Sequence, residues 1–245
     1  MIAAVLFDLD GVLIDSEVSW DEARRAVVAR HGGRWIPGAT EAMQGMSAPE
    51  WSAYLRDRAG LDLDTGAIVA EVLEALTATY AEHLPVIPGA LEAVRRIASC
   101  WPVALCTSAN RVVIDDVLAR TGLAETFAVS VSSEEVARGK PAPDVYLEGA
   151  RRLGAEPSRC VVIEDSANGI RAGVAAGMLV VAIPNREFPP PAEVLDAARL
   201  VLATIGDLTA EVVRAAADAE AALDEDERES FPASDPHSDW AGPPG

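Results

Sequence analysis

Short apolar runs alternate with amphipathic stretches over most of the chain. The apolar runs have the length of buried strands and cover 2–7, 103–106, 127–131, 160–163 and 179–183. The stretches with a helical period cover 90–98, 112–121, 144–153 and 169–176. This alternation predicts an α/β fold, with a Rossmann-like parallel sheet and helices on both of its faces.

One segment breaks the alternation directly after the first strand. Helical patterns, separated by Gly and Pro residues, cover 16–31, 48–59 and 65–84. The α/β pattern resumes at Pro88-Gly89. We therefore predict a small helical domain at 16–84, inserted into an α/β core that is formed by 1–15 and 85–217.

The C-terminal end has a composition of its own. A last helix is expected at 207–222, and residues 218–245 hold nine acidic residues, one arginine and four prolines. These residues account for −8 of the formal net charge of −19. Such a segment buries too little apolar surface to fold alone. We predict an acidic, disordered tail that acts as a solubilising terminus rather than as an interaction tail.

The composition limits the classes of partner. Half of the 245 residues are apolar, which is typical of a globular protein with a sizeable core. A net charge of −19 without any run of Lys or Arg repels nucleic acid and anionic membranes. No apolar stretch approaches the ~20 residues of a membrane span, and the first residues lack the basic start of a signal peptide. We expect a cytoplasmic protein without nucleic-acid or membrane partners.

The cysteines and histidines carry no metal or disulfide signal. Cys100, Cys106 and Cys160 form no CxxC pair and are too few for a disulfide framework. Cys106 and Cys160 lie in apolar runs, so we expect them in the core. The histidines without ligand spacing are His31, His83 and His237.

Side chains with acid–base or phosphate chemistry follow four of the predicted strands. They are Asp8 and Asp10 after the first strand, Thr107 and Ser108 after the second, Lys140 in the loop after the third, and Glu164 and Asp165 after the fourth. Ligands bind at the carboxyl ends of parallel strands. We therefore expect these side chains to converge at one edge of the sheet.

Four carboxylates in one place need a cation, because like charges raise one another's pKa. Mg²⁺ prefers one or two carboxylates together with water and phosphate oxygens. A carboxylate such as Asp8 can attack phosphorus, and Asp10, two residues on, can act as acid and base. Lys140 is the only lysine among 20 basic residues. The bulkier planar guanidinium of Arg does not replace a compact ammonium. The occurrence of the only lysine in this loop therefore supports a phosphate site there.

Four segments, in this order, resemble the motifs of the haloacid dehalogenase-like superfamily. They are Asp8-Leu9-Asp10-Gly11-Val12-Leu13-Ile14-Asp15-Ser16, Thr107-Ser108, Lys140-Pro141 and Glu164-Asp165-Ser166-x-x-Gly169. The resemblance covers about residues 1–217. The helical insertion resembles the small α-helical cap of the β-phosphoglucomutase and sugar-phosphatase branch. The four motifs together are far more specific than any one of them.

The resemblance implies a metal site and a nucleophile. Asp8 is then the nucleophile and a metal ligand. Asp10 is the general acid and base, and it lends its backbone carbonyl to the metal. Asp165 is a Mg²⁺ ligand, and Glu164 is either a ligand or a residue behind the ligands.

The resemblance also implies how the substrate is held. Thr107 and the Ser108 backbone hold the phosphoryl group, and Lys140 bridges it to the nucleophile. In the cap, Glu17 and Trp20 are the candidates for substrate contact, together with 44–47. The segment 15–20 is similar to that of phosphatases acting on hexitol and deoxysugar phosphates.

The reaction that fits the motif set best is Mg²⁺-dependent hydrolysis of a small phosphate ester, a sugar or polyol phosphate. A dehalogenase attacks carbon and has no need of Asp10. The alternative is a β-phosphoglucomutase-like phosphomutase, whose pattern carries His and Arg where this chain has Trp20 and Ala48. A phospho-Asp signalling or binding module shares the acidic pocket, but its acceptor Asp follows a later strand and it has no such insertion.

Ordinary structural roles are the alternative for several of these residues. Thr107 and Ser108 could merely cap the helix that follows them, and we expect Ser166 and Asn168 to be caps. Trp35 and Trp51 are expected to pack inside the cap. The linkers at 12–16 and 84–89 are expected to act as hinges for the cap.

Overall fold

The computed structural model describes residues 1–43, 46–185 and 189–217, and it contains one six-stranded parallel sheet. The strands are β1 (Ala4–Phe7), β2 (Val103–Thr107), β3 (Val129–Ser132), β4 (Cys160–Glu164), β5 (Leu179–Ala182) and β6 (Leu200–Val201). Their order is β3-β2-β1-β4-β5-β6. The predicted α/β fold is confirmed. The sixth strand was not predicted; it is only two residues long.

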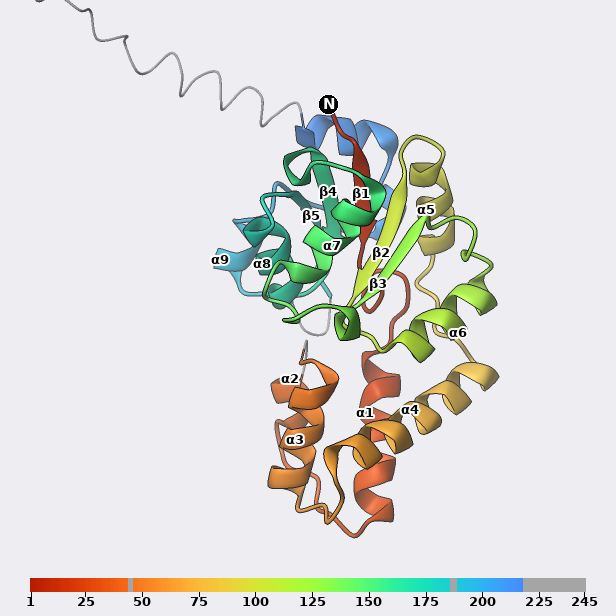
Figure 1. Cartoon of the computed structure of the whole chain (residues 1–245), viewed down its shortest axis with the longest axis vertical. Coiled ribbons are helices and arrows are strands. Elements are labelled where there is room, and N and C mark those ends of the chain that lie inside the picture. Colours follow the sequence, from red (N-terminus) through yellow and green to blue (C-terminus); the bar gives the residue numbers. More distant parts are fainter. Residues whose placement is uncertain (44–45, 186–188, 218–245) are drawn as a thin grey trace, which may run out of the picture.

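Helices cover both faces of the sheet (Figure 1). They are α5 (Ala90–Ala98), α6 (Arg111–Thr121), α7 (Asp144–Leu153), α8 (Ala167–Ala175) and α9 (Ala192–Leu195), with 3-10 turns η1 (Ser133–Glu135), η2 (Pro157–Arg159) and η3 (Ile205–Asp207). Side chains alternate between the faces of a strand. In β1, Val5 and Phe7 join the core cluster under α5 and α6, whereas Ala4 and Leu6 join the cluster under α7 and α8.

Four helices between β1 and α5 form a separate group beyond the carboxyl ends of the strands (Figure 1). They are α1 (Glu17–Arg30), α2 (Ala39–Met43), α3 (Ala48–Ala59) and α4 (Thr65–Glu82), and we call them the cap. Local residues set the start of α4 and the end of α3: Asp64 caps the N-terminus of α4 by accepting the Ala67 N–H at 3.0 Å, and Gly60 ends α3 with a φ of 75°. The short α2 was not predicted. The division of the chain at 16 and 85 stays a prediction.

Several other predictions concern the ends and the surface of the chain. Cys106 and Cys160 are buried, as expected, and Cys100 is exposed. Residues 210–217 are helical, so the expected last helix begins three residues later than predicted, and its end at 218–222 and the tail at 218–245 lie outside the described residues. None of the described helices has the length and apolar character needed to cross a membrane.

Helix α7 packs closely against the sheet at Gly149. A Cβ atom there would overlap the Cys106 sulfur and lie 3.0 Å from Cδ2 of Leu6. We expect Gly149→Ala to destabilise the protein by about 1–3 kcal/mol, although Ala favours helices by about 1 kcal/mol. The measurement is the midpoint of denaturant unfolding. Leu147→Ala on the exposed side of α7 is the matched control, with an expected change within about 0.5 kcal/mol. Equal stability of Gly149→Ala and the wild type would contradict this packing.

Candidate active site

The chain turns sharply where β1 ends, and Gly11 makes the turn possible. Its φ is 76°, and its N–H donates to the Ile14 carbonyl at 2.8 Å. A Cβ atom on Gly11 would overlap the carboxylate of Asp165. Glycine is therefore required at this position for two reasons: the positive φ of the turn and the close approach of the loops that follow β1 and β4.

Lys140 lies at the centre of the site and is buried. Its ammonium donates to Asp8 Oδ1 and to Glu164 Oε1, each at 2.7 Å, and to the Cys106 carbonyl at 3.1 Å. These contacts satisfy all three of its protons. Burial alone would lower the pKa of Lys140, but the charges of Asp8 and Glu164 outweigh burial and raise that pKa. The ammonium thus stays charged and fixed between two carboxylates.

Glu164 is fully buried, and donors surround both of its carboxylate oxygens. Oε1 accepts from Lys140 and, at 2.8 Å, from the Tyr146 hydroxyl. Oε2 accepts from the N–H groups of Asp165 at 2.9 Å and Ser166 at 3.0 Å. Burial works to raise the pKa of Glu164, yet Lys140 and these hydrogen bonds lower it. Glu164 therefore orients Lys140 and the loop after β4.

Asp8, Glu164 and Asp165 form an acidic cluster, with a carboxylate oxygen from each within 4.8 Å of the others. Burial is the main cause that raises the pKa of Asp8 and of Asp165, and the nearby charge of Glu164 adds to it. A divalent cation would favour the charged forms, and hard oxygen donors suit Mg²⁺. Asp8 and Asp165 line the pocket above the cluster. These two carboxylates therefore fit a metal ion best.

Asp10 lies apart from that cluster, with its carboxylate turned toward the cap. Its Oδ1 accepts from the Ser16 hydroxyl at 2.5 Å and from Trp20 Nε1 at 3.3 Å. Burial raises the pKa of Asp10, while these two hydrogen bonds oppose the shift. The side chain of Asp10 thus lines the same pocket but is not one of the carboxylates of the cluster.

Thr107 ends β2 and Ser108 begins the loop after it, and both residues line the same pocket as Asp8. The Thr107 hydroxyl accepts the Ala109 N–H at 3.1 Å and so tightens the turn. Neither residue caps α6, because Glu134 from the neighbouring loop takes that place. Its carboxylate accepts from Asn110 Nδ2 at 2.6 Å and from the Arg111 N–H at 2.8 Å.

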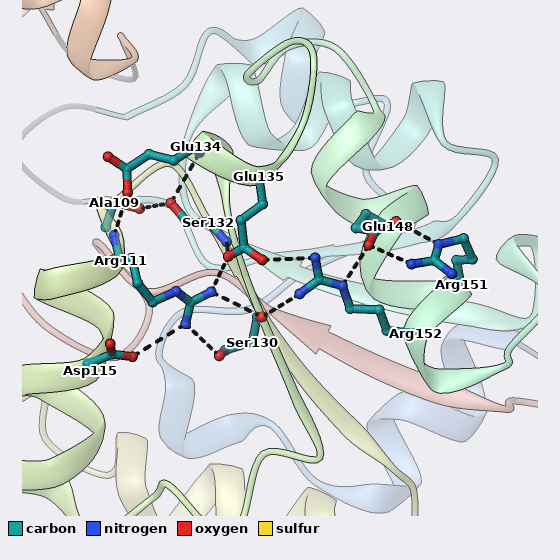
Figure 2. Close-up of polar contacts among 10 residues, drawn as sticks. All are labelled: Ala109, Arg111, Asp115, Ser130, Ser132, Glu134, Glu135, Glu148, Arg151 and Arg152. Atoms are coloured by element: carbon teal, nitrogen blue, oxygen red, sulfur yellow. Dashed lines mark hydrogen bonds and ion pairs between the residues drawn. The ribbon is translucent and has the colours of Figure 1, made fainter.

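Serine hydroxyls fasten the loops after β2 and β3 to each other. Ser132 Oγ donates to the Ala109 carbonyl at 2.7 Å (Figure 2). Ser133 Oγ donates to the Ser108 carbonyl at 2.9 Å. Because the second loop also leads to Lys140, these hydrogen bonds join the two loops that reach the pocket from this side.

An arginine network continues this connection along β3, the edge strand (Figure 2). Arg111 and Arg152 both donate to the Ser130 carbonyl at 3.2 Å, and both pair with Glu135. Arg152 also pairs with Glu148. The guanidinium groups cover an exposed strand edge that would otherwise offer a carbonyl to another chain. Sequence reasoning missed this network, although Ser132 and Glu135 form a capping box that signals the turn.

The cap closes the pocket from the other side. Glu17 and Trp20, the predicted substrate-contact residues, line it, and so do Arg24 and Trp51, which sequence reasoning had not placed there. Asn110 also belongs to the lining. All of these face the pocket that Asp8, Asp10, Lys140 and Asp165 line from the core.

The remaining predicted residues have mixed outcomes. Ser166 caps α8 by accepting the Gly169 N–H at 3.1 Å, as expected. Asn168 lies inside α8 and lines the pocket, so its expected cap role is wrong. His31 contacts Glu71 at 2.9 Å on the cap surface. Gln44 and Gly45, of the predicted substrate loop, lie outside the described residues.

The family model and the similar proteins agree on the family of this chain. The family model for haloacid dehalogenase-like hydrolases matches residues 2–177. The chain is 33% identical to a bifunctional riboflavin kinase/FMN phosphatase of Arabidopsis thaliana over 75% of its own length but only 48% of that protein's length. It is 32% identical to the fructose-1-phosphate phosphatase YqaB of Escherichia coli, covering 72% of this chain and 93% of the relative.

A solved structure is similar over most of the molecule. CbbY from Rhodobacter sphaeroides, in complex with phosphate, superposes with a TM-score of 0.74 at 26% sequence identity. The superposition covers 85% of this chain and 96% of that chain. The likeness therefore includes both the sheet and the cap.

The arginine network predicts an acid-sensitive contribution to stability. Burial works to raise the pKa of Glu135, but the hydrogen bonds from Arg111, from the Ser132 N–H and from Arg152 hold it at about 2. The carboxylate therefore stabilises the fold above the unfolded-state pKa of ~4.3, and this contribution is lost as the pH falls toward 2. Glu135→Gln should lower the free energy of unfolding by about 1 kcal/mol at pH 7, a value reduced by solvent screening.

The difference between Glu135→Gln and the wild type should shrink as the pH falls below 4.3, and chemical denaturation between pH 7 and pH 3 measures it. Glu125→Gln, at an exposed position, serves as the control. A difference that stays constant over this range would contradict the ion-pair account.

Proposed function

Since the chain belongs to the haloacid dehalogenase-like hydrolase family, we propose that it is a Mg²⁺-dependent phosphomonoester hydrolase that acts on a sugar or polyol phosphate through an aspartyl-phosphate. The observation that carries the proposal is the buried Lys140 ammonium, 2.7 Å from both Asp8 and Glu164, beside Asp165. This arrangement offers a carboxylate nucleophile together with positive charge for a phosphate, which is what phosphoryl transfer requires.

Asp8 is the nucleophile in this proposal. Its carboxylate attacks phosphorus, a new bond forms between the carboxylate oxygen and phosphorus, and the bond to the ester oxygen breaks. Lys140 holds the attacking carboxylate and places a positive charge beside the site of the phosphoryl group, while Thr107 and Ser108 hold the phosphoryl group from the β2 side. Water then attacks phosphorus, which returns Asp8 and releases inorganic phosphate.

Asp10 carries the protons of both steps. In the first step it gives a proton to the leaving ester oxygen, and in the second it takes a proton from the attacking water. The hydrogen bonds from Ser16 and Trp20 fix its carboxylate for this task. The cap therefore reaches the chemistry through the residue that moves protons.

A bound Mg²⁺ would supply charge that offsets the phosphate and the crowded carboxylates. Asp8 and Asp165 would hold it, with the backbone carbonyl of Asp10 as a further donor. Glu164 keeps its oxygens for Lys140, Tyr146 and two backbone N–H groups, so we assign it a positioning role rather than ligation.

The names of two relatives support the proposed substrate class. One relative is a fructose-1-phosphate phosphatase and another carries an FMN phosphatase, and both names describe small phosphate esters. The mutase alternative is less favoured because Trp20, which stands where that pattern has His, already donates to Asp10. Exchange between hexose 1- and 6-phosphates that depends on a bisphosphate primer would instead indicate a mutase.

Asp8→Asn should abolish phosphate release, because the amide is not a nucleophile. We expect a loss of at least about 10³-fold in kcat with a sugar phosphate and Mg²⁺. Asp115→Asn, exposed on α6, is the control and should keep wild-type turnover. Equal phosphate release from Asp8→Asn and the wild type would refute the assignment.

Metal dependence is tested with a chelator. EDTA should remove activity and excess Mg²⁺ should restore it, because the phosphate would otherwise face uncompensated carboxylates. Asp165→Asn should raise the Mg²⁺ concentration for half-maximal activity at least about 100-fold, since even changes behind a ligand cost 10–100-fold. Full activity of the wild type in EDTA would argue against the metal.

A further inference from the structure

Arg24 on α1 is a cation inside the candidate active site that the proposed mechanism leaves without a task. Its side chain is buried, with 6% relative exposure, and it lines the same pocket as Asp8 and Lys140. Within the described part of the chain, its Nε finds no hydrogen-bond partner. A buried guanidinium with an unused donor is costly, so a role for it is needed.

Two indole rings hold this guanidinium in place. Its central carbon lies 5.0 Å from the centre of the Trp20 ring and 5.2 Å from that of Trp51. The two rings are 6.2 Å apart and tilted by 60°. Cation–π contact fixes the position of the guanidinium but uses none of its N–H donors. Packing alone would be served as well by an apolar side chain of similar length.

The charges around Arg24 indicate what kind of group it meets. Burial lowers the pKa of Arg24 to about 10, and the charges of Glu17, Asp10 and Asp21 oppose this shift. Asp21 is also paired with Arg25. This end of the pocket thus presents one guanidinium next to the carboxylates of Glu17 and Asp10, without an excess of positive charge. A second phosphate or carboxylate on the substrate would be repelled by these acids.

We infer that Arg24 determines specificity by donating to hydroxyl oxygens of an uncharged polyol skeleton, while Glu17 accepts from the same hydroxyls. Hydroxyl groups both donate and accept, and so match a site with one guanidinium and one carboxylate. The inference rests on the proposed function and narrows it: monophosphates of neutral polyols should be preferred over bisphosphates.

The test compares three esters with the wild type and Arg24→Met. Methionine keeps an unbranched stem between the indoles and removes every donor. For sorbitol 6-phosphate we expect kcat/KM to fall about 10- to 100-fold, mainly through KM, because donors are lost. For p-nitrophenyl phosphate, which has no hydroxyls, the change should stay within about threefold. The wild type should turn over fructose 1,6-bisphosphate less well than sorbitol 6-phosphate.

Arg25→Met is the matched control. Arg25 neighbours Arg24 on α1 and also lies over an indole, 4.4 Å from the centre of Trp35, but it is exposed. Arg25→Met should leave kcat/KM unchanged for sorbitol 6-phosphate and for p-nitrophenyl phosphate. Arg24→Lys keeps the charge but loses the planar fork, and it should still weaken sorbitol 6-phosphate several-fold; it replaces Arg24→Met if that variant fails to fold.

The outcomes separate this inference from the proposed function. A selective loss with sorbitol 6-phosphate supports the role of Arg24. An equal loss with both monophosphates overturns it and leaves the phosphatase intact, as does a wild-type preference for the bisphosphate. A wild type that releases phosphate from none of the three esters refutes the proposed function and the inference together.

Discussion

The site depends on one buried ammonium that lies between two carboxylates. Lys140 contacts Asp8 from the β1 loop and Glu164 from the β4 strand, so it joins the two strands at the centre of the sheet. Removing one member of such a buried group leaves a charge without a partner and costs several kcal/mol. The surrounding structure serves this contact: Tyr146 and two backbone N–H groups hold Glu164, and a Cβ on Gly169 would overlap its carboxylate.

Side-chain hydrogen bonds, rather than sheet pairing, then align the loops. The loop after β2 is fastened to the loop after β3 through Ser132, Ser133 and Glu134. The loops after β1 and β4 are brought together because Gly11 has no side chain. Each loop is thus held in position by contacts with a neighbouring loop. The closely packed sheet supports all of these loops.

Much of the fold and part of the site could be predicted from the sequence. Buried parallel strands are continuous apolar runs, so five strands and helices α5, α7 and α3 were located well. Arg24 could not be found, because Arg24, Arg25 and Arg30 look alike on one helical period and only the packed cap shows which is buried. The role of Glu164 stayed open for a similar reason: donors from Tyr146 and the backbone are not visible in a motif.

The contact between Trp20 and Asp10 limits how modular the protein is. Because the cap is inserted at one point of the chain, it could be exchanged between relatives. The sheet would keep its catalytic residues, and the new cap would change the range of substrates. Here Trp20, in the first helix of the cap, donates a hydrogen bond to Asp10, the residue proposed to transfer protons. A chimera that is joined at residue 16 would lose the Trp20 donor together with the original cap. The junction has to lie beyond Trp20, or the incoming helix has to bring a donor of equal reach.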